Sequence, residues 1–194
     1  MLRITINHDF GMKAPWLECD GSWRVISNNS RSKLYEDKES FFTIGFRRKL
    51  NVGLAFPLSK YEHGGVVWSL LGQGPMCRWD TVVNAGFLVW DHKPRDMGAK
   101  TYEDRLADAK RFLEVFNSWV NDECFCYKLE RVTACESCGS WVTEELGACG
   151  GFIGGDHLFD DLRELMGEYA GEEYEFAGNC AYLGDYRVLE AKNG

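Results

Sequence analysis

Hydrophobic and polar residues alternate at several places along the chain, and such alternation predicts half-buried β-strands. At the N-terminus, Leu2, Ile4 and Ile6 alternate with polar neighbours. Further strand patterns are SWRVIS (22–27), FFTIGF (41–46), VVWSLL (66–71), TVVNAGFLVW (81–90), ECFCYKLERVT (123–133) and AYLGDYRVLE (181–190). Gly86, near the middle of the 81–90 pattern, indicates a bulge or a close approach of another backbone.

Two stretches place apolar residues every three or four positions and therefore predict amphipathic helices. The first covers about 101–120, where Thr101 is expected to be the N-cap and Asp104 to complete a capping box. The second covers about 156–169, with Asp156 as its expected N-cap. The apolar stripe of the first helix is Leu106, Ala109, Leu113, Phe116 and Val120.

Strands combined with two helices predict an α+β fold. We expect a mixed, mainly antiparallel sheet, covered by the two principal helices of about 101–120 and 156–169, with a cysteine-containing hairpin. At 194 residues the chain can bury a sizeable core, and we expect a single domain over 1–194. No apolar run reaches the roughly 18 residues of a membrane span. The N-terminus lacks the pattern of a signal peptide, so the expected location is cytoplasmic.

Charge is distributed unevenly along the chain, whose net charge is −8. Residues 1–100 contain 14 Lys+Arg and 10 Asp+Glu, whereas residues 101–194 contain 8 and 20. An acidic half repels nucleic acid, so direct nucleic-acid binding is not expected, but it attracts the basic groove of a protein that binds nucleic acid. Acidic surfaces also simply keep proteins soluble, and that interpretation stays open.

The second helix and its extension carry the densest charge. Residues 156–175 hold eight Asp+Glu against one Arg. Carboxylates displayed along a rigid helix can imitate the phosphates of a duplex, which favours a DNA-mimicking protein. The predicted partner-binding residues are Asp160, Asp161, Glu164, Glu168, Glu172 and Glu173.

Cysteines supply the sharpest local motif, Cys135-Glu-Ser-Cys138-Gly139. Two thiolates separated by two residues and followed by glycine can hold zinc from one side, and zinc usually takes four ligands. Structural zinc is therefore the one cofactor that the sequence suggests, although a hairpin of free thiols and redox chemistry remain alternatives. The predicted metal ligands are Cys126, Cys135, Cys138 and Cys149, with Cys124 or His157 as alternatives to Cys126.

Histidines are too few and too scattered to define a catalytic triad. We therefore expect no enzyme and assign no catalytic residue. The alternative is a small metal- or His/Asp-dependent hydrolase acting on nucleic acid or a nucleotide. Such an enzyme would use His63, Asp80 or His92 for acid–base chemistry.

Several motifs occur in an order that resembles a family of uncharacterised bacteriophage and mobile-element accessory proteins. They are Tyr61-Glu62-His63-Gly64-Gly65, Cys77-Arg78-Trp79-Asp80, Gly86-Phe87-Leu88-Val89, FNSWVNDECFCYKLE (116–130) and ACGGFIGGDHL (148–158). The corresponding family motifs are of the types YDHSG, CPWDSGQVGFIYV, YLTGDVYGYVVE and DSCWGFYG. This chain lacks the Ser-Gly after Trp79-Asp80 and the Trp of the last motif.

The resemblance implies an accessory protein of a phage or plasmid, present in the cytoplasm of a bacterial host. Small acidic accessory proteins of this kind are similar in role to inhibitors of CRISPR or restriction nucleases. The leading hypothesis is therefore an anti-CRISPR or antirestriction protein that binds a host defence nuclease, or its complex, through its acidic C-terminal half. A zinc-stabilised adaptor protein is a further alternative.

Overall fold

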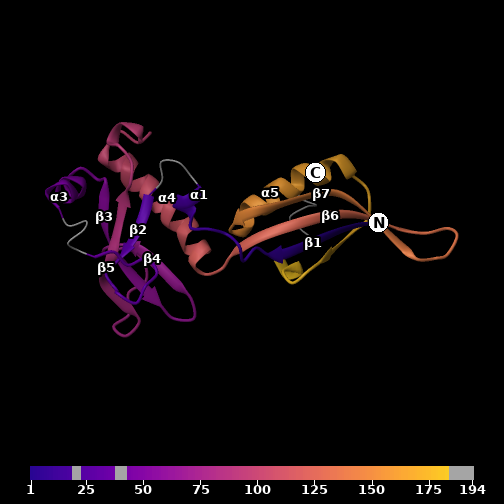
Figure 1. Cartoon of the computed structure of the whole chain (residues 1–194), viewed down its shortest axis with the longest axis horizontal. Coiled ribbons are helices and arrows are strands. Elements are labelled where there is room, and N and C mark those ends of the chain that lie inside the picture. Colours follow the sequence, from indigo (N-terminus) through magenta and orange to yellow (C-terminus); the bar gives the residue numbers. More distant parts are fainter. Residues whose placement is uncertain (19–22, 38–42, 184–194) are drawn as a thin grey trace. The chain divides into compact units, whose positions relative to one another are not determined.

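The computed structural model describes residues 1–18, 23–37 and 43–183, and the chain divides into two compact units (Figure 1). The terminal unit consists of Met1–Met12 and Asp122–Gly194, and the central unit consists of Lys13–Asn121. The predicted α+β class is confirmed. The strands form two four-stranded sheets rather than one, and each unit has its own sheet, helix and core. The single domain expected over 1–194 stays a prediction.

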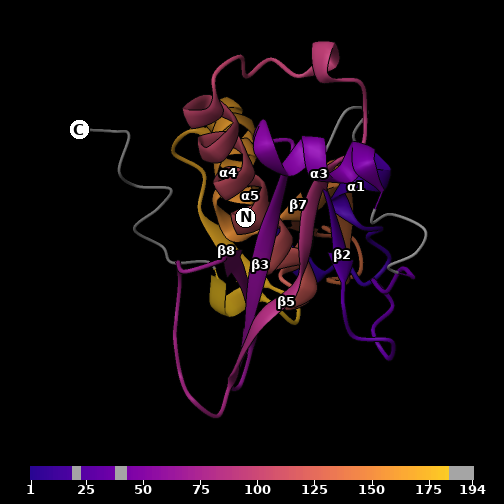
Figure 2. The same cartoon turned by 90° about the vertical axis from the view of Figure 1, so that its left-hand side faces the viewer.

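The central unit is built on an antiparallel sheet. Its strands are β2 (Trp23–Ser27), β3 (Ala55–Glu62), β4 (Val66–Leu70) and β5 (Thr81–Trp90), in the order β2-β5-β3-β4. Figure 2 shows β2, β5 and β3 lying side by side. A Cβ at Gly86 would lie 2.1 Å from the backbone oxygen of Ile26, so the close approach expected at this glycine is confirmed.

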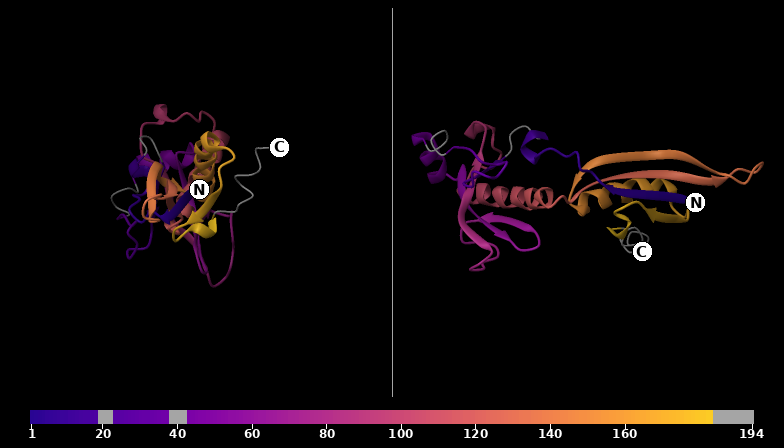
Figure 3. Two further views of the ribbon diagram at one scale, coloured as in Figure 1. Left: turned by 90° about the vertical axis from the view of Figure 1, so that its right-hand side faces the viewer. Right: turned by 60° about the horizontal axis from the view of Figure 1, so that its bottom comes forward.

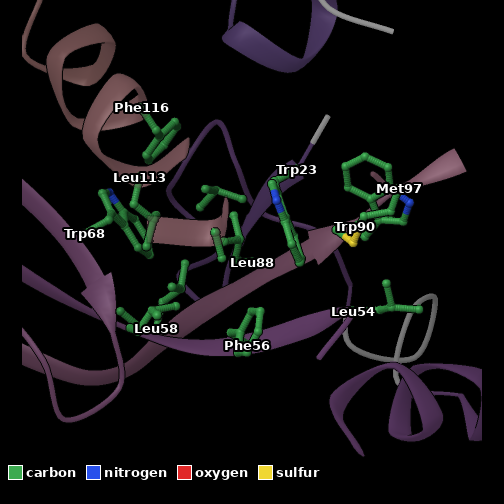
Figure 4. Packing of buried hydrophobic residues seen from close by; sticks show 14 residues of the cluster. Trp23, Leu54, Phe56, Leu58, Trp68, Leu88, Trp90, Met97, Leu113 and Phe116 are labelled. Atoms are coloured by element: carbon green, nitrogen blue, oxygen red, sulfur yellow. The ribbon is translucent and has the colours of Figure 1, made fainter. Parts of the chain in front are cut away.

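Helix α4 (Tyr102–Val120) packs on this sheet, as its apolar stripe predicts. Thr101 and Asp104 form the expected capping box, and the hydrogen bonds from Thr101 lower the pKa of Asp104. Figure 4 shows Leu113 and Phe116 of the helix facing the apolar side chains of the sheet, among them Trp68. All three of these side chains are buried.

Smaller elements complete the central unit: α1 (Pro15–Glu18), α3 (Ile44–Asn51) and the 3-10 turn η1 (Pro94–Asp96). The strand expected over 41–46 is wrong for residues 43–46, and residues 41 and 42 lie outside the described residues. Thr43 caps α3 by accepting a hydrogen bond from the backbone N–H of Phe46. A hydroxyl placed there favours a helix start over continuation of a strand.

The terminal unit contains a mixed sheet of order β7-β6-β1-β8. Its strands are β1 (Leu2–His8), β6 (Cys124–Ala134), β7 (Trp141–Ile153) and β8 (Tyr174–Ala177), and β1 pairs with β8 in parallel. Strands β6 and β7 are the expected cysteine-containing hairpin. The alternation predicted at the N-terminus is confirmed, because the alternate apolar residues of β1, from Leu2 to Ile6, are fully buried.

Helix α5 (Gly155–Met166) covers this sheet and continues into the 3-10 turn η2 (Gly167–Tyr169). The second predicted helix is thus confirmed, but its N-cap is Gly154 at φ 79° and not Asp156, which lies in the first turn. The strand expected over 181–190 is wrong at its start, since η3 (Ala181–Leu183) is a 3-10 turn, and residues 184–190 lie outside the described residues. None of the helices in the described part of the chain has the length and apolarity needed to cross a bilayer.

Candidate functional site

The division into units keeps the charge asymmetry that the two halves of the sequence show. The terminal unit contains 6 Lys+Arg and 17 Asp+Glu, a net charge of −11. The central unit contains 16 and 13, a net charge of +3. The asymmetry is kept because residues 1–12, which include β1, have no net charge, and residues 101–121, which include α4, have a net charge of only −1.

Three of the six predicted partner-binding residues already have partners within the terminal unit. Asp160 forms an ion pair with Arg163, one turn further along α5. Asp161 is half-buried and accepts a hydrogen bond of 2.5 Å from the hydroxyl of Tyr127. Glu172 is paired with Arg131 on β6 at 2.8 Å.

The other three, Glu164, Glu168 and Glu173, are exposed. Their carboxylates have no ion pair or hydrogen bond among the described residues. Glu164 lies on α5, Glu168 on the turn η2 that continues it, and Glu173 immediately before β8. The acidic surface available to a partner is therefore narrower than the sequence suggests, and these three carboxylates are its most available groups.

A second cluster of charged side chains lies on the sheet of the terminal unit, and the sequence alone does not reveal it. Glu130 on β6 and Glu145 on β7 are direct cross-strand neighbours, a like-charge arrangement that is unfavourable by itself. The ammonium group of Lys128 lies 2.8 Å from Glu130 and 3.3 Å from Glu145. Hydrogen bonds to these two carboxylates raise the pKa of Lys128. This carboxylate pair is thus partly neutralised and is a weaker candidate for partner binding.

Two of the three residues named for hydrolase chemistry come together in the central unit. The Nδ1 atom of His63, in the turn after β3, lies 3.3 Å from Oδ2 of Asp80. The backbone N–H of Glu62 also donates to the carbonyl of Asp80, which fixes the two segments side by side. His92 lies beyond the other end of β5, about 30 Å away along the strand, so it does not join them.

The His63–Asp80 pair is open to solvent rather than enclosed. The side chain of His63 is 72% exposed and that of Asp80 is 30% exposed. The central unit has one cavity of about 300 Å³ beside Trp68 and another of about 480 Å³ beside Trp90. Neither His63 nor Asp80 lines either cavity. The pair is able to orient a proton, but these cavities do not place a small substrate against it.

The four predicted zinc ligands lie in two separate places on the hairpin. Cys126 is on β6 beside Gly150, and Cys149 is on β7 opposite Tyr127. Cys135 and Cys138 lie in the turn at the far end, roughly 25–30 Å away along the strand. Zinc–sulfur bonds are about 2.3 Å long, so the four sulfurs do not share one ion. Among the described residues, no three His, Cys, Asp or Glu side chains form a group that could hold a metal.

The turn at the tip holds its two cysteines in a defined geometry. The backbone N–H of Cys135 donates to Ser140 at 2.7 Å, and the N–H of Gly139 donates to Cys135 at 2.8 Å. The sulfur of Cys135 lies 3.1 Å from the hydroxyl of Ser137. Hydrogen bonds from Ser137, and then from Cys138, lower the pKa of Cys135 to about 6. Cys135 is therefore largely a thiolate at neutral pH.

Sequence reasoning missed a pair of amides that close the edge of the central sheet. The side chain of Asn117 accepts from the N–H of Trp68 at 2.8 Å and donates to its carbonyl at 3.0 Å. Asn121 does the same to Val66, at 2.7 and 2.8 Å. The i, i+4 spacing places both on one helix face, and this spacing was the available signal. The amides take the place of a further strand along β4.

Comparison of the chain with protein-family models, with curated proteins and with solved structures gives no match.

Proposed function

We propose that this protein is a non-enzymatic inhibitor that docks its acidic terminal unit on the basic, nucleic-acid-binding surface of a partner protein. The observation that carries the proposal is the net charge of −11 in a unit that contains fewer than half of the residues. A surface of this charge accelerates encounter with a basic groove and disfavours direct binding to nucleic acid.

The contact groups of the proposed surface are Glu164, Glu168 and Glu173. All three are exposed and lack ion pairs among the described residues, so docking does not require an existing pair to break. Glu164 and Glu168 are four residues apart on a continuous helical segment, a rise of about 6 Å. Because the helix is held on the sheet by a buried apolar face, the carboxylates are presented with little freedom to lose on binding.

The motifs that resemble mobile-element accessory proteins favour a nuclease of bacterial defence, of the CRISPR or restriction type, as the partner. Such a nuclease exposes a basic channel for its nucleic acid, which is the surface that an acidic unit would compete for. The protein would then act in the cytoplasm of the bacterial host.

The test is a plasmid-cleavage assay with a panel of purified CRISPR effectors and restriction endonucleases, with and without the protein. The parent is expected to inhibit at least one of them, and less strongly as salt rises, because screening weakens exposed charge contacts. The triple variant Glu164→Lys, Glu168→Lys, Glu173→Lys is expected to lose most of this inhibition.

A control reverses two charges away from the proposed contact groups, with Glu114→Lys on α4 and Glu144→Lys on β7, both at exposed positions. These substitutions are expected to leave inhibition within about twofold, since rim charges mainly tune the association rate. Equal inhibition by the parent and the triple variant, or no inhibition of any nuclease in the panel, would contradict the proposal.

A hydrolase is the second candidate, favoured by the 3.3 Å approach of His63 and Asp80. A carboxylate that orients an imidazole is a recurring element of acid–base catalysis. Purified protein would be incubated with nucleotides and single-stranded nucleic acid. Turnover that disappears in both His63→Ala and Asp80→Asn would support this function over the inhibitor.

A further inference from the structure

The cysteine pair at the tip of the β6–β7 hairpin has no role in the proposed acidic surface. The hairpin continues beyond β1, because the last residue of β6 that pairs with β1 is Arg131 and the β6–β7 pairs run on to Ala134 and Trp141 (Figure 3). Cys135 is half-buried and Cys138 is exposed in the turn that follows. Both thiols are therefore within reach of another molecule.

The sequence of the turn and the conformation of its glycine resemble those of a metal-binding knuckle. A Cys-x-x-Cys-Gly segment can hold zinc from one side, and a glycine in the left-handed conformation lets the chain turn tightly after the second cysteine. Gly139 has φ 70°. The hydroxyl of Ser137 lies 3.1 Å from the sulfur of Cys135. The glycine of the turn thus already has the backbone conformation of such a segment.

The turn alone does not supply enough ligands for a zinc ion. Structural zinc takes four ligands, and this turn supplies two. Cys126 and Cys149 lie roughly 25–30 Å back along the hairpin and are excluded. No third His, Cys, Asp or Glu among the described residues completes a group with the pair. The remaining ligands must come from a second molecule.

We propose that the hairpin tips of two copies of this chain share one zinc ion, bound by Cys135 and Cys138 of each copy. A twofold axis through the ion makes the two contributions identical, which is the commonest symmetry of protein dimers. Four thiolates complete the tetrahedral site. The site is incomplete in a single chain.

Exposed apolar side chains next to the turn support a contact between copies at this tip. Trp141 and Val142 directly follow the turn, and they are 72% and 52% exposed. Exposed apolar side chains beside a ligand pair are what an interface would cover.

The test measures the mass and zinc content of the full chain in solution, with a non-chelating reductant present. Light scattering coupled to size exclusion is expected to give a dimer with added zinc and a monomer with EDTA. Metal analysis of the dimer is expected to give about 0.5 zinc per chain, the ratio of one four-ligand site per two copies. Cobalt in place of zinc is expected to give the absorption bands of a tetrahedral tetrathiolate.

The variants Cys135→Ser and Cys138→Ser are each expected to remain monomeric with zinc and to lose the cobalt bands. Cys149→Ser removes another exposed thiol of the same hairpin, and it is expected to change neither the dimerisation with zinc nor the cobalt bands. Full zinc occupancy of a monomer, zinc binding that survives both tip variants, an internal disulfide in place of metal, or adventitious zinc only, without dimers, would each overturn the proposal.

This experiment is independent of the proposed inhibitory function. The charge-reversal variant at Glu164, Glu168 and Glu173 keeps both tip cysteines and is expected to dimerise with zinc as the parent does. Failure of the nuclease assay and failure of the zinc assay are therefore distinguishable.

Discussion

The terminal and central units have the same ingredients and use their polar groups differently. Each consists of a four-stranded sheet with an amphipathic helix packed on it. In the central unit, Asn117 and Asn121 of α4 turn toward the sheet and satisfy the backbone of its edge strand. In the terminal unit, three carboxylates on and after α5 remain exposed and unpaired among the described residues. Polar groups stabilise the fold in the first case and are available for recognition in the second.

Cavity-forming substitutions in the two cores are expected to have the largest effects. Phe116→Ala in the central core should reduce the free energy of unfolding by about 3–5 kcal/mol, and Leu129→Ala in the terminal core by about 2–5 kcal/mol, because both residues are fully buried. Urea unfolding measures the loss of free energy of unfolding, and amide hydrogen exchange shows in which residues the protection from exchange decreases. Phe10→Ala, at a position that is 78% exposed, is the control and should cost little.

These two substitutions also test whether the cores of the two units are independent of each other. Separate cores predict that Phe116→Ala lowers protection mainly within residues 13–121, and Leu129→Ala mainly within residues 122–183. Equal loss of protection in both regions from either variant would mean that the cores are not independent.

Loss of an edge amide should have the next largest effect. Asn117→Ala leaves the N–H and carbonyl of the buried Trp68 without their partners, and Asn121→Ala does so at Val66. We expect each to cost about 1–3 kcal/mol, the cost of unsatisfied buried polar groups. Thermal unfolding measures this loss. Glu114→Ala, exposed on the same helix, should change stability by less than about 0.5 kcal/mol, and an equal effect at Glu114 would contradict the role given to the amides.

Removal of one hydroxyl should have a smaller effect in the terminal unit. Tyr127→Phe deletes the hydrogen bond of 2.5 Å to the carboxylate of Asp161. The expected cost is roughly 1–2 kcal/mol, since the acceptor is charged but only half-buried. Tyr61→Phe is the control, because the hydroxyl of Tyr61 has no hydrogen bond among the described residues, and it should leave urea unfolding unchanged.

The same hydroxyl gives the smallest effect, a dependence on alkaline pH. Burial, and then the hydrogen bond to Asp161, raise the pKa of Tyr127 above its ordinary value of 10.0. A raised pKa in the folded state means that this stabilisation is fully present below pH 10 and is lost as pH rises through the raised value. Tyr127→Phe should therefore flatten the alkaline limb of stability against pH. An unchanged limb would show that another group governs it.

Local patterns predicted a substantial part of the structure. The alternation of Leu2, Ile4 and Ile6 and the spacing of Leu113 and Phe116 correctly located a strand and a helix, because burial of one face requires that periodicity. The capping box at Thr101 was also predicted, since its partners are three residues apart. The stretch 43–46 was mistaken for a strand because a short apolar segment is compatible with either structure, and the cap at Thr43 decided it.

The sequence by itself determined the α+β class, the two principal helices and the acidic character of the C-terminal half, since these depend on composition and local periodicity. Only the tertiary structure decided that β1 belongs to the acidic unit, that the strands form two sheets, and that Cys126 and Cys149 lie far from Cys135 and Cys138. It also decided which carboxylates are already paired. Pairing between distant segments depends on which buried faces fit together, and this cannot be predicted from their separation along the sequence.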